Sequence, residues 1–508
     1  MNRKWLPVVY AVLGIVIGIL LTLNYQKIFP SRTLKVSGHG WDKLQLVLQS
    51  VQDNYVDEVN YSEASEAAIE ALLAKLDPHS VYMPPVVLEK SNEELSAGFD
   101  GIGIQFNVPN DTAIVIEVIP GGPSEKIGMQ PGDRLLMVDT VGIAGVQYPQ
   151  DSMVRRMRGP AGTKVTVTVK RGEDTIPFEI TRGRIPMHSV DAAFMVDDTT
   201  GYIRLSKFSR STYAEVAKAG IQLQGEGMGR LILDIRGNSG GYFDQALMLS
   251  DLFLKENAPI VYTEGLHRDR ESFNATGKGI FTDLPLTVLI DGGSASSSEI
   301  FAGAMQDNGR AVIVGRRSFG KGLVQEPIQF SDGSGIRLTV ARFYTPSGRC
   351  LQKPYSEDYE LEVYKRYDEG EMVVADSMKV DSGGIIPDVF VPMDTSRVTQ
   401  FYLSCIRKAT TMRFASAWFD AHHDDINWIE DYDVLNRFLD MAGLEKKFLA
   451  FARERDGLVP APGEWEETRP YLMTQVRALV GRYSKLGDNA YYHLFFPEDN
   501  VIQCAIGL

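Results

Sequence analysis

The chain has 508 residues, 44% hydrophobic and 23% charged, which is enough to bury several cores. Its formal net charge of −14, without any basic cluster, argues against nucleic acid as a partner. Its three cysteines (Cys350, Cys405 and Cys504) are too few and too far apart for a disulfide framework. No spacing typical of metal ligands appears, so we expect no metal and no cofactor.

The amino terminus predicts a membrane anchor. Met1–Lys4 is basic, and Trp5–Leu23 is a run of 19 residues without a charge. As a helix this run would be ~28 Å long, close to the ~30 Å of a bilayer core. It is longer than the apolar part of a cleaved signal peptide and no A-x-A site follows, which favours an uncleaved anchor over a removed signal. Basic residues flank both ends, so the positive-inside rule does not decide the orientation. The simplest topology is a single-pass inner-membrane anchor with a short cytoplasmic tail, residues 1–30, and the remainder in the periplasm.

Residues 40–92 predict a small helical region. Apolar side chains recur there at the spacing of one helix face, in two separate stretches. The first stretch contains Leu44, Val47, Leu48 and Val51, and the second contains Ile69, Leu72, Leu73 and Leu76. Asp77-Pro78 is expected to end the second helix.

Residues 93–184 predict a separate binding module. Thr163–Lys170 alternates as a half-buried strand does, Ile114–Ile119 is a second apolar run, and Asp151–Arg158 is typical of a short helix. This arrangement resembles a PDZ domain. The resemblance implies that Gly101-Ile102-Gly103-Ile104 is its carboxylate loop, whose backbone N–H groups grip the end of a peptide that adds as a strand.

Four apolar residues of this module are candidates for the pocket that takes the last side chain of such a peptide. They are Ile102, Ile104, Val154 and Met157. Ordinary core packing is the alternative role for each. Arg158, beside the end of the short helix, is a weaker candidate for coupling the module to the rest of the chain.

Residues 185–395 alternate strands and helices, which predicts an α/β core. Leu231–Ile235 is a strand that leads into the turn Gly237-Asn238-Ser239-Gly240-Gly241 and then a helix, Phe243–Leu254. Glycines there can present backbone N–H groups that no side chain shields, as an oxyanion requires. A plain strand-to-helix turn is the alternative.

A serine-rich segment follows the next strand. Ser294-Ala295-Ser296-Ser297-Ser298-Glu299 lies between the apolar run Leu286–Ile290 and a helical stretch, Ile300–Asn308. Ser296 therefore falls in a tight elbow at a helix N-terminus, which favours negative charge nearby. The alternative is that Ser296-x-x-Glu299 is only a capping box.

A lysine between glycines comes next, in Gly320-Lys321-Gly322. A serine hydroxyl needs a neutral base, and lysine, with an ordinary pKa of ~10.4, meets that need only in an apolar pocket without a carboxylate partner. Phe319, Leu323 and Val324 supply apolar neighbours, and the nearest acid along the chain is Glu326. Gln325 can orient the amine without adding negative charge. None of the seven histidines lies in the serine or lysine segment, so histidine is an unfavoured base.

These segments together resemble the C-terminal processing peptidases, the serine peptidase family that includes tail-specific protease. The matching motifs occur in the family's order over residues 40–395: Leu76-Asp77-Pro78-His79-Ser80, Gly101–Ile104, Pro131-Gly132-Asp133, Leu233–Gly241, the serine and lysine segments, and Gly384-Ile385-Ile386-Pro387-Asp388. The resemblance implies a ClpP/crotonase-like peptidase core with an inserted PDZ domain. It also implies a Ser-Lys acyl-enzyme mechanism on protein substrates with exposed C-terminal tails.

The resemblance assigns the site residues by motif position. Ser296 is the nucleophile, Lys321 the base and Gln325 the residue that orients it. The oxyanion donors come from the turn Gly240-Gly241 and from the amide of Ser297, a position where the family usually has alanine. A PDZ-bearing scaffold with an inactive core is the competing hypothesis.

The last segment, residues 396–508, is aromatic and helix-like. The resemblance gives this extension no role, so partner binding and structural support are both open. In the family the N-terminal helical region can contribute to assembly, which makes a homo-oligomer an expectation as well.

Overall fold

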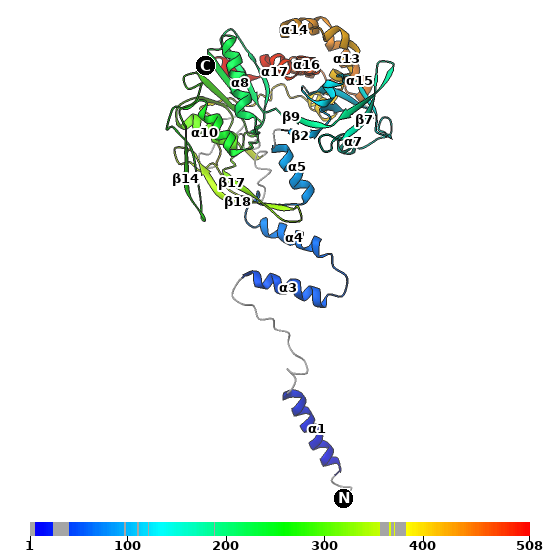
Figure 1. Cartoon of the computed structure of the whole chain (residues 1–508), viewed down its shortest axis with the longest axis vertical. Helices are drawn as coiled ribbons and strands as arrows, with labels where there is room; N and C mark the ends of the chain where they lie inside the picture. Colours follow the sequence, from blue (N-terminus) through cyan, green and yellow to red (C-terminus); the bar gives the residue numbers. More distant parts are fainter. Residues whose placement is uncertain are drawn as a thin grey trace. The chain divides into compact units, whose positions relative to one another are not determined.

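The computed structural model describes residues 6–23, 40–95, 98–108, 111–119, 121–186, 188–355, 365–366, 370 and 383–508. The chain forms two compact units, Met1–Leu72 and Leu73–Leu508 (Figure 1).

The first unit is helical. Its helices are α1 (Leu6–Leu23), α3 (Gly40–Asn54) and α4 (Tyr61–Leu73), the last of which crosses the unit boundary. The helix ends at Leu73, about one turn earlier than the periodicity predicted, so Leu76 lies in the following turn. Among the helices in the described ranges, none combines the length and the apolar character needed to cross a membrane.

The core of the second unit is built on a six-stranded sheet in the order β10-β11-β12-β15-β16-β19. Its strands are β10 (Val190–Met195), β11 (Thr200–Leu205), β12 (Arg230–Asp234), β15 (Leu286–Ile290), β16 (Val312–Gly315) and β19 (Val389–Phe390). From β11 to β19 all neighbours are parallel, and the central strands are continuous buried apolar runs because both faces of the sheet are covered.

Three helices cover one face of this sheet, and they are seen in green beside it in Figure 1. They are α8 (Thr212–Gly225), α9 (Phe243–Asp251) and α10 (Ser297–Asp307). Parallel strands need such crossover helices, and their placement brings the turns after β12 and β15 to the same edge of the sheet.

A second, antiparallel sheet carries the lysine segment. It has the order β1-β18-β13-β14, with β17 also paired to β18. Its strands are β1 (Val81–Met83), β13 (Pro259–Gly265), β14 (Arg268–Asn274), β17 (Leu323–Gln329) and β18 (Gly335–Tyr344). Pairing of Val81 with Arg337 brings the early Asp77-Pro78-His79 segment next to strands more than 200 residues later.

The PDZ domain has its own sheet, in the order β3-β4-β5-β7-β8 with β6 on β5. Its elements are β3 (Ile104–Asn107), β4 (Ala113–Val118), α6 (Pro123–Lys126), β5 (Arg134–Val138), β6 (Val141–Gly142), α7 (Gln150–Met157), β7 (Lys164–Arg171) and β8 (Asp174–Thr181). The predicted strands and helix of this module are confirmed to within a residue or two.

A two-stranded ribbon joins the PDZ domain to its surroundings. β2 (Gly98–Gly101) pairs with β9 (Gly183–Pro186), and α5 (Pro85–Leu95) precedes it. The guanidinium of Arg158 lies 4.3 Å from the centre of the Phe99 ring on this ribbon. Arg158 therefore links the end of α7 to the connection, through a cation–π contact.

The C-terminal extension consists of seven α-helices and one 3-10 turn in the described chain. They are α12 (Gln400–Arg407), α13 (Thr410–Ile426), α14 (Tyr432–Met441), α15 (Leu444–Asp456), α16 (Glu464–Tyr483), α17 (Gly487–Phe495), η4 (Phe496–Glu498) and α18 (Asn500–Ile506). They bury a hydrophobic core of their own.

The extension also covers the second face of the core sheet. Val501 and Ile502 of α18 pack with Leu289 and Val314 of the sheet. On its other side, Arg134 of the PDZ domain pairs with Asp420 at 3.3 Å. The extension is thus a structural part of the second unit that contacts both the core sheet and the PDZ domain.

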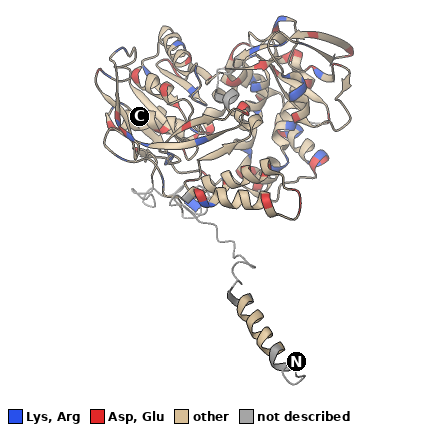
Figure 2. Cartoon of the chain, turned by 60° about the horizontal axis from the view of Figure 1, so that its bottom comes forward, with Lys and Arg blue, Asp and Glu red and all other residues tan. Residues whose placement is uncertain are grey.

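Charged side chains of both signs are interspersed over the second unit (Figure 2). One such pair of opposite charges is Arg134 of β5 and Asp420 of α13, 3.3 Å apart.

Candidate active site

Ser296 occupies a strained elbow between β15 and α10. Its φ and ψ are 54° and −113°, a combination that a residue with a Cβ rarely adopts. Such strain persists only where the surroundings hold it, and here the capping box does so: the backbone N–H of Ser296 donates to Oε2 of Glu299 at 2.9 Å. Ser296 is therefore both the N-cap of α10 and the residue at the tight elbow, so the two interpretations of the sequence hold together.

Glu299 joins the serine segment to the lysine segment. Its carboxylate is fully buried and accepts from both. Oε2 accepts from the backbone N–H of Ser296 and of Lys321 at 2.9 and 2.8 Å, and Oε1 accepts from the Ser318 hydroxyl and the Gly320 N–H at 2.5 and 2.7 Å. Burial raises the pKa of Glu299, and the four donors act against that rise. The sequence predicts only a capping role for Glu299. Its hydrogen bonds to the lysine segment were not predicted.

Lys321 is partly buried and lies two residues before β17 begins. Glu326, the nearest acid along the chain, forms an exposed ion pair with Arg268 of β14 at 2.7 Å. The contact of Glu299 with Lys321 is made through the lysine's backbone N–H.

Gln325 lies on β17, four residues after Lys321. Its amide nitrogen donates to the backbone carbonyl of His79 at 2.6 Å, which fixes the plane of the amide. A bulge between Val324 and Gln325 in the pairing of β17 with β18 sets the direction of this side chain. The structure thus brings Gln325 to the Asp77-Pro78-His79-Ser80 motif.

His79 is a neighbour of Lys321 that the sequence did not foresee. Burial and the charge of Lys321 lower the pKa of His79 from 6.5 to about 4, against the opposing charge of Asp77. The imidazole is therefore neutral at neutral pH. Asp77 itself is held by the N–H groups of His79 and Ser80 at 2.8 and 2.7 Å, which keeps the motif in a tight turn.

The glycine turn after β12 lies against the serine elbow. A Cβ on Gly240 would stand 2.8 Å from the Cβ of Ser296 and 2.9 Å from the amide nitrogen of Ser297. The N–H of Gly240 donates to Oδ1 of Asn238 at 2.9 Å, so this amide is already engaged within the turn. Gly241 is left as the turn's candidate oxyanion donor, beside the amide of Ser297.

A buried charge network supports this turn from behind. Asp234 accepts from Arg204 at 2.7 Å and from Arg236 at 2.6 Å, and Arg236 also reaches Asp499 of the C-terminal extension at 2.8 Å. Burial opposes the ionised form of Asp234, but the two arginines hold its pKa well below the ordinary value. The extension therefore takes part in fixing the strand end that leads to the glycine turn.

The predicted peptide-binding residues of the PDZ domain fall into two groups. Ile102 and Met157 are buried in the PDZ core, which favours the packing role for them. Ile104 and Val154 are half-buried and stay candidates for a pocket. Gly103 has φ of +79°, the left-handed conformation that glycine adopts most readily.

Comparison with known proteins agrees with this geometry. The model of peptidase family S41 matches residues 199–361, and that of the PDZ domain matches residues 101–181. The carboxyl-terminal-processing protease of Synechocystis sp. is 38% identical over 299 residues, which cover 57% of this chain and 69% of that protein. This chain belongs to the carboxyl-terminal processing proteases of family S41.

Two further relatives of this processing protease extend the comparison. The carboxy-terminal processing protease CtpA of Bacillus subtilis is 30% identical over 351 residues, which cover 69% of this chain and 74% of that protein. Among solved structures, the photosystem II D1 C-terminal processing protease is 27% identical, with a TM-score of 0.40, over 70% of this chain and 87% of that one. The predicted family and fold class are confirmed, and the chain belongs to a family of serine peptidases.

Proposed function

We propose that this processing protease cleaves proteins near their C-terminal ends by a Ser-Lys mechanism. The observation that carries the proposal is the shared carboxylate of Glu299, which holds the strained Ser296 elbow and the Lys321 backbone on one oxygen. The glycine turn supports it from the other side, because Gly240 lies against both Ser296 and the Ser297 amide.

In the proposed reaction the neutral amine of Lys321 takes the proton of the Ser296 hydroxyl as the oxygen attacks the peptide carbonyl. The N–H groups of Gly241 and Ser297 stabilise the oxyanion of the tetrahedral intermediate. Collapse expels the new amino terminus, which receives the proton from Lys321, and leaves an ester on Ser296. A water molecule, deprotonated by Lys321, hydrolyses that ester and restores the enzyme. Gln325 orients the base.

Substitution of the proposed pair tests the mechanism. We expect Ser296→Ala and Lys321→Ala to abolish hydrolysis of an unstructured protein substrate, with folding and tail binding kept. Lys321→Arg should be equally inactive, because arginine stays protonated. Gln325→Ala should lose less. An active Lys321→Arg enzyme would refute the general-base role, and a fully active Ser296→Ala enzyme would move the nucleophile to Ser297 or Ser298.

We also propose that the PDZ domain captures substrate tails through the loop Gly101–Ile104. Ile104 and Val154, half-buried, would contact the last side chain of the tail. An amidated tail lacks the charge and the second oxygen that backbone N–H groups recognise. We expect amidation to slow cleavage below saturation, and Gly103→Leu to remove that difference. Equal rates for free and amidated tails would contradict tail recognition.

Membrane anchoring is a proposal that rests on the sequence of Trp5–Leu23 alone. The proposed location is the inner membrane, with the catalytic part in the periplasm. Fractionation of cells that express the full chain tests it, with a chain starting at Lys35 as the control. Recovery of the full chain in the soluble fraction would overturn it.

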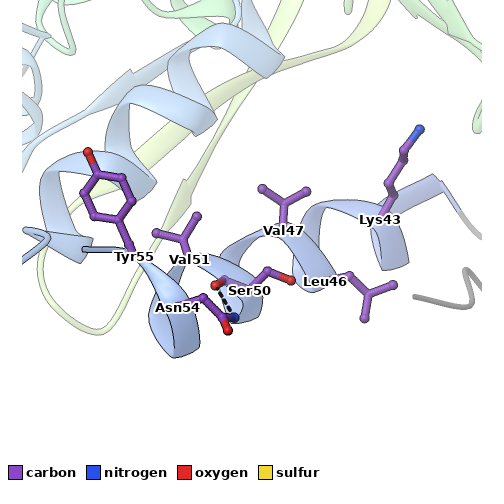
Figure 3. Close-up of a pocket in the computed structure, with 7 residues that line it drawn as sticks. All are labelled: Lys43, Leu46, Val47, Ser50, Val51, Asn54 and Tyr55. Atoms are coloured by element: carbon purple, nitrogen blue, oxygen red, sulfur yellow. Dashed lines mark hydrogen bonds between the residues drawn. The ribbon is translucent and has the colours of Figure 1, made fainter. Parts of the chain in front are cut away.

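Self-association through α3 is the remaining proposal. Leu44, Val47 and Leu48 are 48%, 54% and 38% exposed and form one helical stripe, and Val47 and Val51 line a hollow along α3 (Figure 3). Exposed apolar stripes of this kind are typical of helix pairing. Sedimentation of the wild type and of Val47→Lys tests whether the stripe joins two copies.

A further inference from the structure

The three residues before Lys321 have every backbone polar group bonded. On one side, the N–H of Phe319 donates to the Ser294 carbonyl at 2.9 Å, and the N–H of Gly320 donates to Glu299 at 2.7 Å. These contacts face the serine segment. The N–H of Ser318 donates to the carbonyl of Ile385 at 3.0 Å.

The carbonyls of the same residues are held by a segment that follows β18. Arg366 is 2% exposed, and its guanidinium donates to the Ser318 carbonyl at 2.8 Å and to the Phe319 carbonyl at 3.0 Å. Lys353, 1% exposed, donates its backbone N–H to the Gly320 carbonyl at 3.0 Å and places its ammonium 4.1 Å from the centre of the Phe319 ring.

Peptide planarity connects the two sides. In a trans peptide the C=O of one residue and the N–H of the next point in opposite directions. When Arg366 holds the Ser318 carbonyl, the Phe319 N–H must therefore point at the serine segment. When it holds the Phe319 carbonyl, the Gly320 N–H must point at Glu299. The two nitrogens of one rigid guanidinium thus fix two successive peptide planes, the second of which ends one residue before Lys321.

We propose that Arg366 is a positioning residue for Lys321. By gripping these two planes it sets where β17 begins relative to the Ser296 elbow, and so where the lysine amine stands. The inference rests on the proposed Ser-Lys mechanism, and it gives a part in that mechanism to an arginine beyond residues 199–361, the range of the family S41 match. Burial of a guanidinium is expensive, and two backbone carbonyls with good geometry offset that cost.

Steady-state kinetics of Arg366→Ala and Arg366→Lys, in the full chain with an unstructured protein substrate, test the proposal. For Arg366→Ala we expect kcat to fall about 10- to 100-fold, because a displacement of about 1 Å suffices for such a loss. KM and the affinity for a peptide tail should stay at wild-type values. Guanidinium chloride at low millimolar concentration should restore part of kcat, whereas sodium chloride should not. Arg366→Lys should be intermediate, since an ammonium holds one carbonyl without fixing both planes.

Arg310→Ala is the matched control. Arg310 also holds loop carbonyls, those of Phe253, Phe281 and Leu284, but at the far end of α10. This variant should lose stability and keep its kcat. Wild-type kcat in folded Arg366→Ala overturns the proposal. If Arg366→Ala does not fold, Arg366→Lys decides: lowered kcat with wild-type tail affinity supports the proposal, and wild-type kcat overturns it.

The Ser-Lys mechanism and the positioning role of Arg366 can be refuted separately. Activity in Lys321→Ala would remove the Ser-Lys mechanism and this inference with it. An inactive Lys321→Ala together with a fully active Arg366→Ala would remove only the positioning role of Arg366.

Discussion

Replacing Glu299 by glutamine tests whether one carboxylate holds the two halves of the active site. The carboxylate accepts four hydrogen bonds, two on each oxygen, from Ser296, Lys321, Ser318 and Gly320. Ser318 also accepts from the N–H of Ile385 at 2.6 Å, so its own proton must go to Glu299. A glutamine has one acceptor oxygen and one NH₂ group. Whichever way the amide lies, its NH₂ faces two donors.

The expected loss of stability follows from the number of hydrogen bonds that the glutamine cannot make. Two hydrogen bonds to a charged group are lost, each worth about 1.5–3 kcal/mol, and two buried donors stay unpaired. Relief of the desolvation of a buried charge offsets part of this loss. We expect Glu299→Gln to destabilise the protein by about 3–5 kcal/mol. One orientation of the glutamine loses the bonds from Ser296 and Lys321, and the other loses those from Ser318 and Gly320. We therefore expect kcat to fall about 100-fold or more even in the folded fraction.

Urea unfolding and peptide hydrolysis, measured on the same preparation, check both numbers. Glu215→Gln is the control, because one oxygen of Glu215 accepts from the N–H groups of Ser189 and Val190 at 2.7 and 3.0 Å. A glutamine oxygen can replace that single acceptor, so the control should lose less than about 1 kcal/mol. Wild-type stability and wild-type kcat in Glu299→Gln would refute the clamp.

Three further outcomes are expected. In Asp499→Asn, Arg236 loses a charged partner, and we expect stability in thermal unfolding to fall by about 1–3 kcal/mol. An unchanged Tm would show that this contact of the extension does not stabilise the charge network. His79 has a folded pKa of about 4 against 6.5 when free, so it favours folding above pH 6.5 and that contribution is lost as pH falls towards 4. His79→Gln should flatten the stability curve in this window by about 1–2 kcal/mol, allowing for partial exposure, and an identical slope would contradict this. Gly240→Ala should lower kcat at least about 100-fold, because its Cβ would meet Ser296. Gly128→Ala is the control: Gly128 also has a positive φ, but its Cβ would have nothing within 4 Å, so this change should cost only about 1 kcal/mol of stability.

Local patterns were sufficient for much of the fold. The run Leu286–Ile290 coincides with β15, and the alternation of Val165, Val167 and Val169 marks β7, because burial on two faces or on one leaves a direct trace in sequence. Domain bounds and site roles stay predictions. The fold class follows from these elements and from the family motifs.

Contacts between residues that are far apart in the sequence leave no such pattern. His79 lies 242 residues from Lys321 in the sequence, and the pairing of β1 with β18 and the bond of Gln325 to the His79 carbonyl bring their segments together. Glu299 has the spacing of an ordinary cap, and its contacts with Gly320 and Lys321 depend on the strand that returns after α10. The engagement of Gly240 by Asn238 is likewise a matter of turn geometry, which glycine content alone does not specify.

The position of Glu299 bears on the proposed use of Lys321 as a base. A lysine that must be neutral should have no carboxylate partner, yet a fully buried carboxylate lies beside this one. The four described bonds of that carboxylate go to three backbone N–H groups and one hydroxyl. The four bonds thus join the two loops that carry Ser296 and Lys321, and among them the bond with Lys321 is to its main chain. A carboxylate held in this way fixes the backbone of the proposed nucleophile and of the proposed base with one side chain, so a change at Glu299 is expected to disturb both.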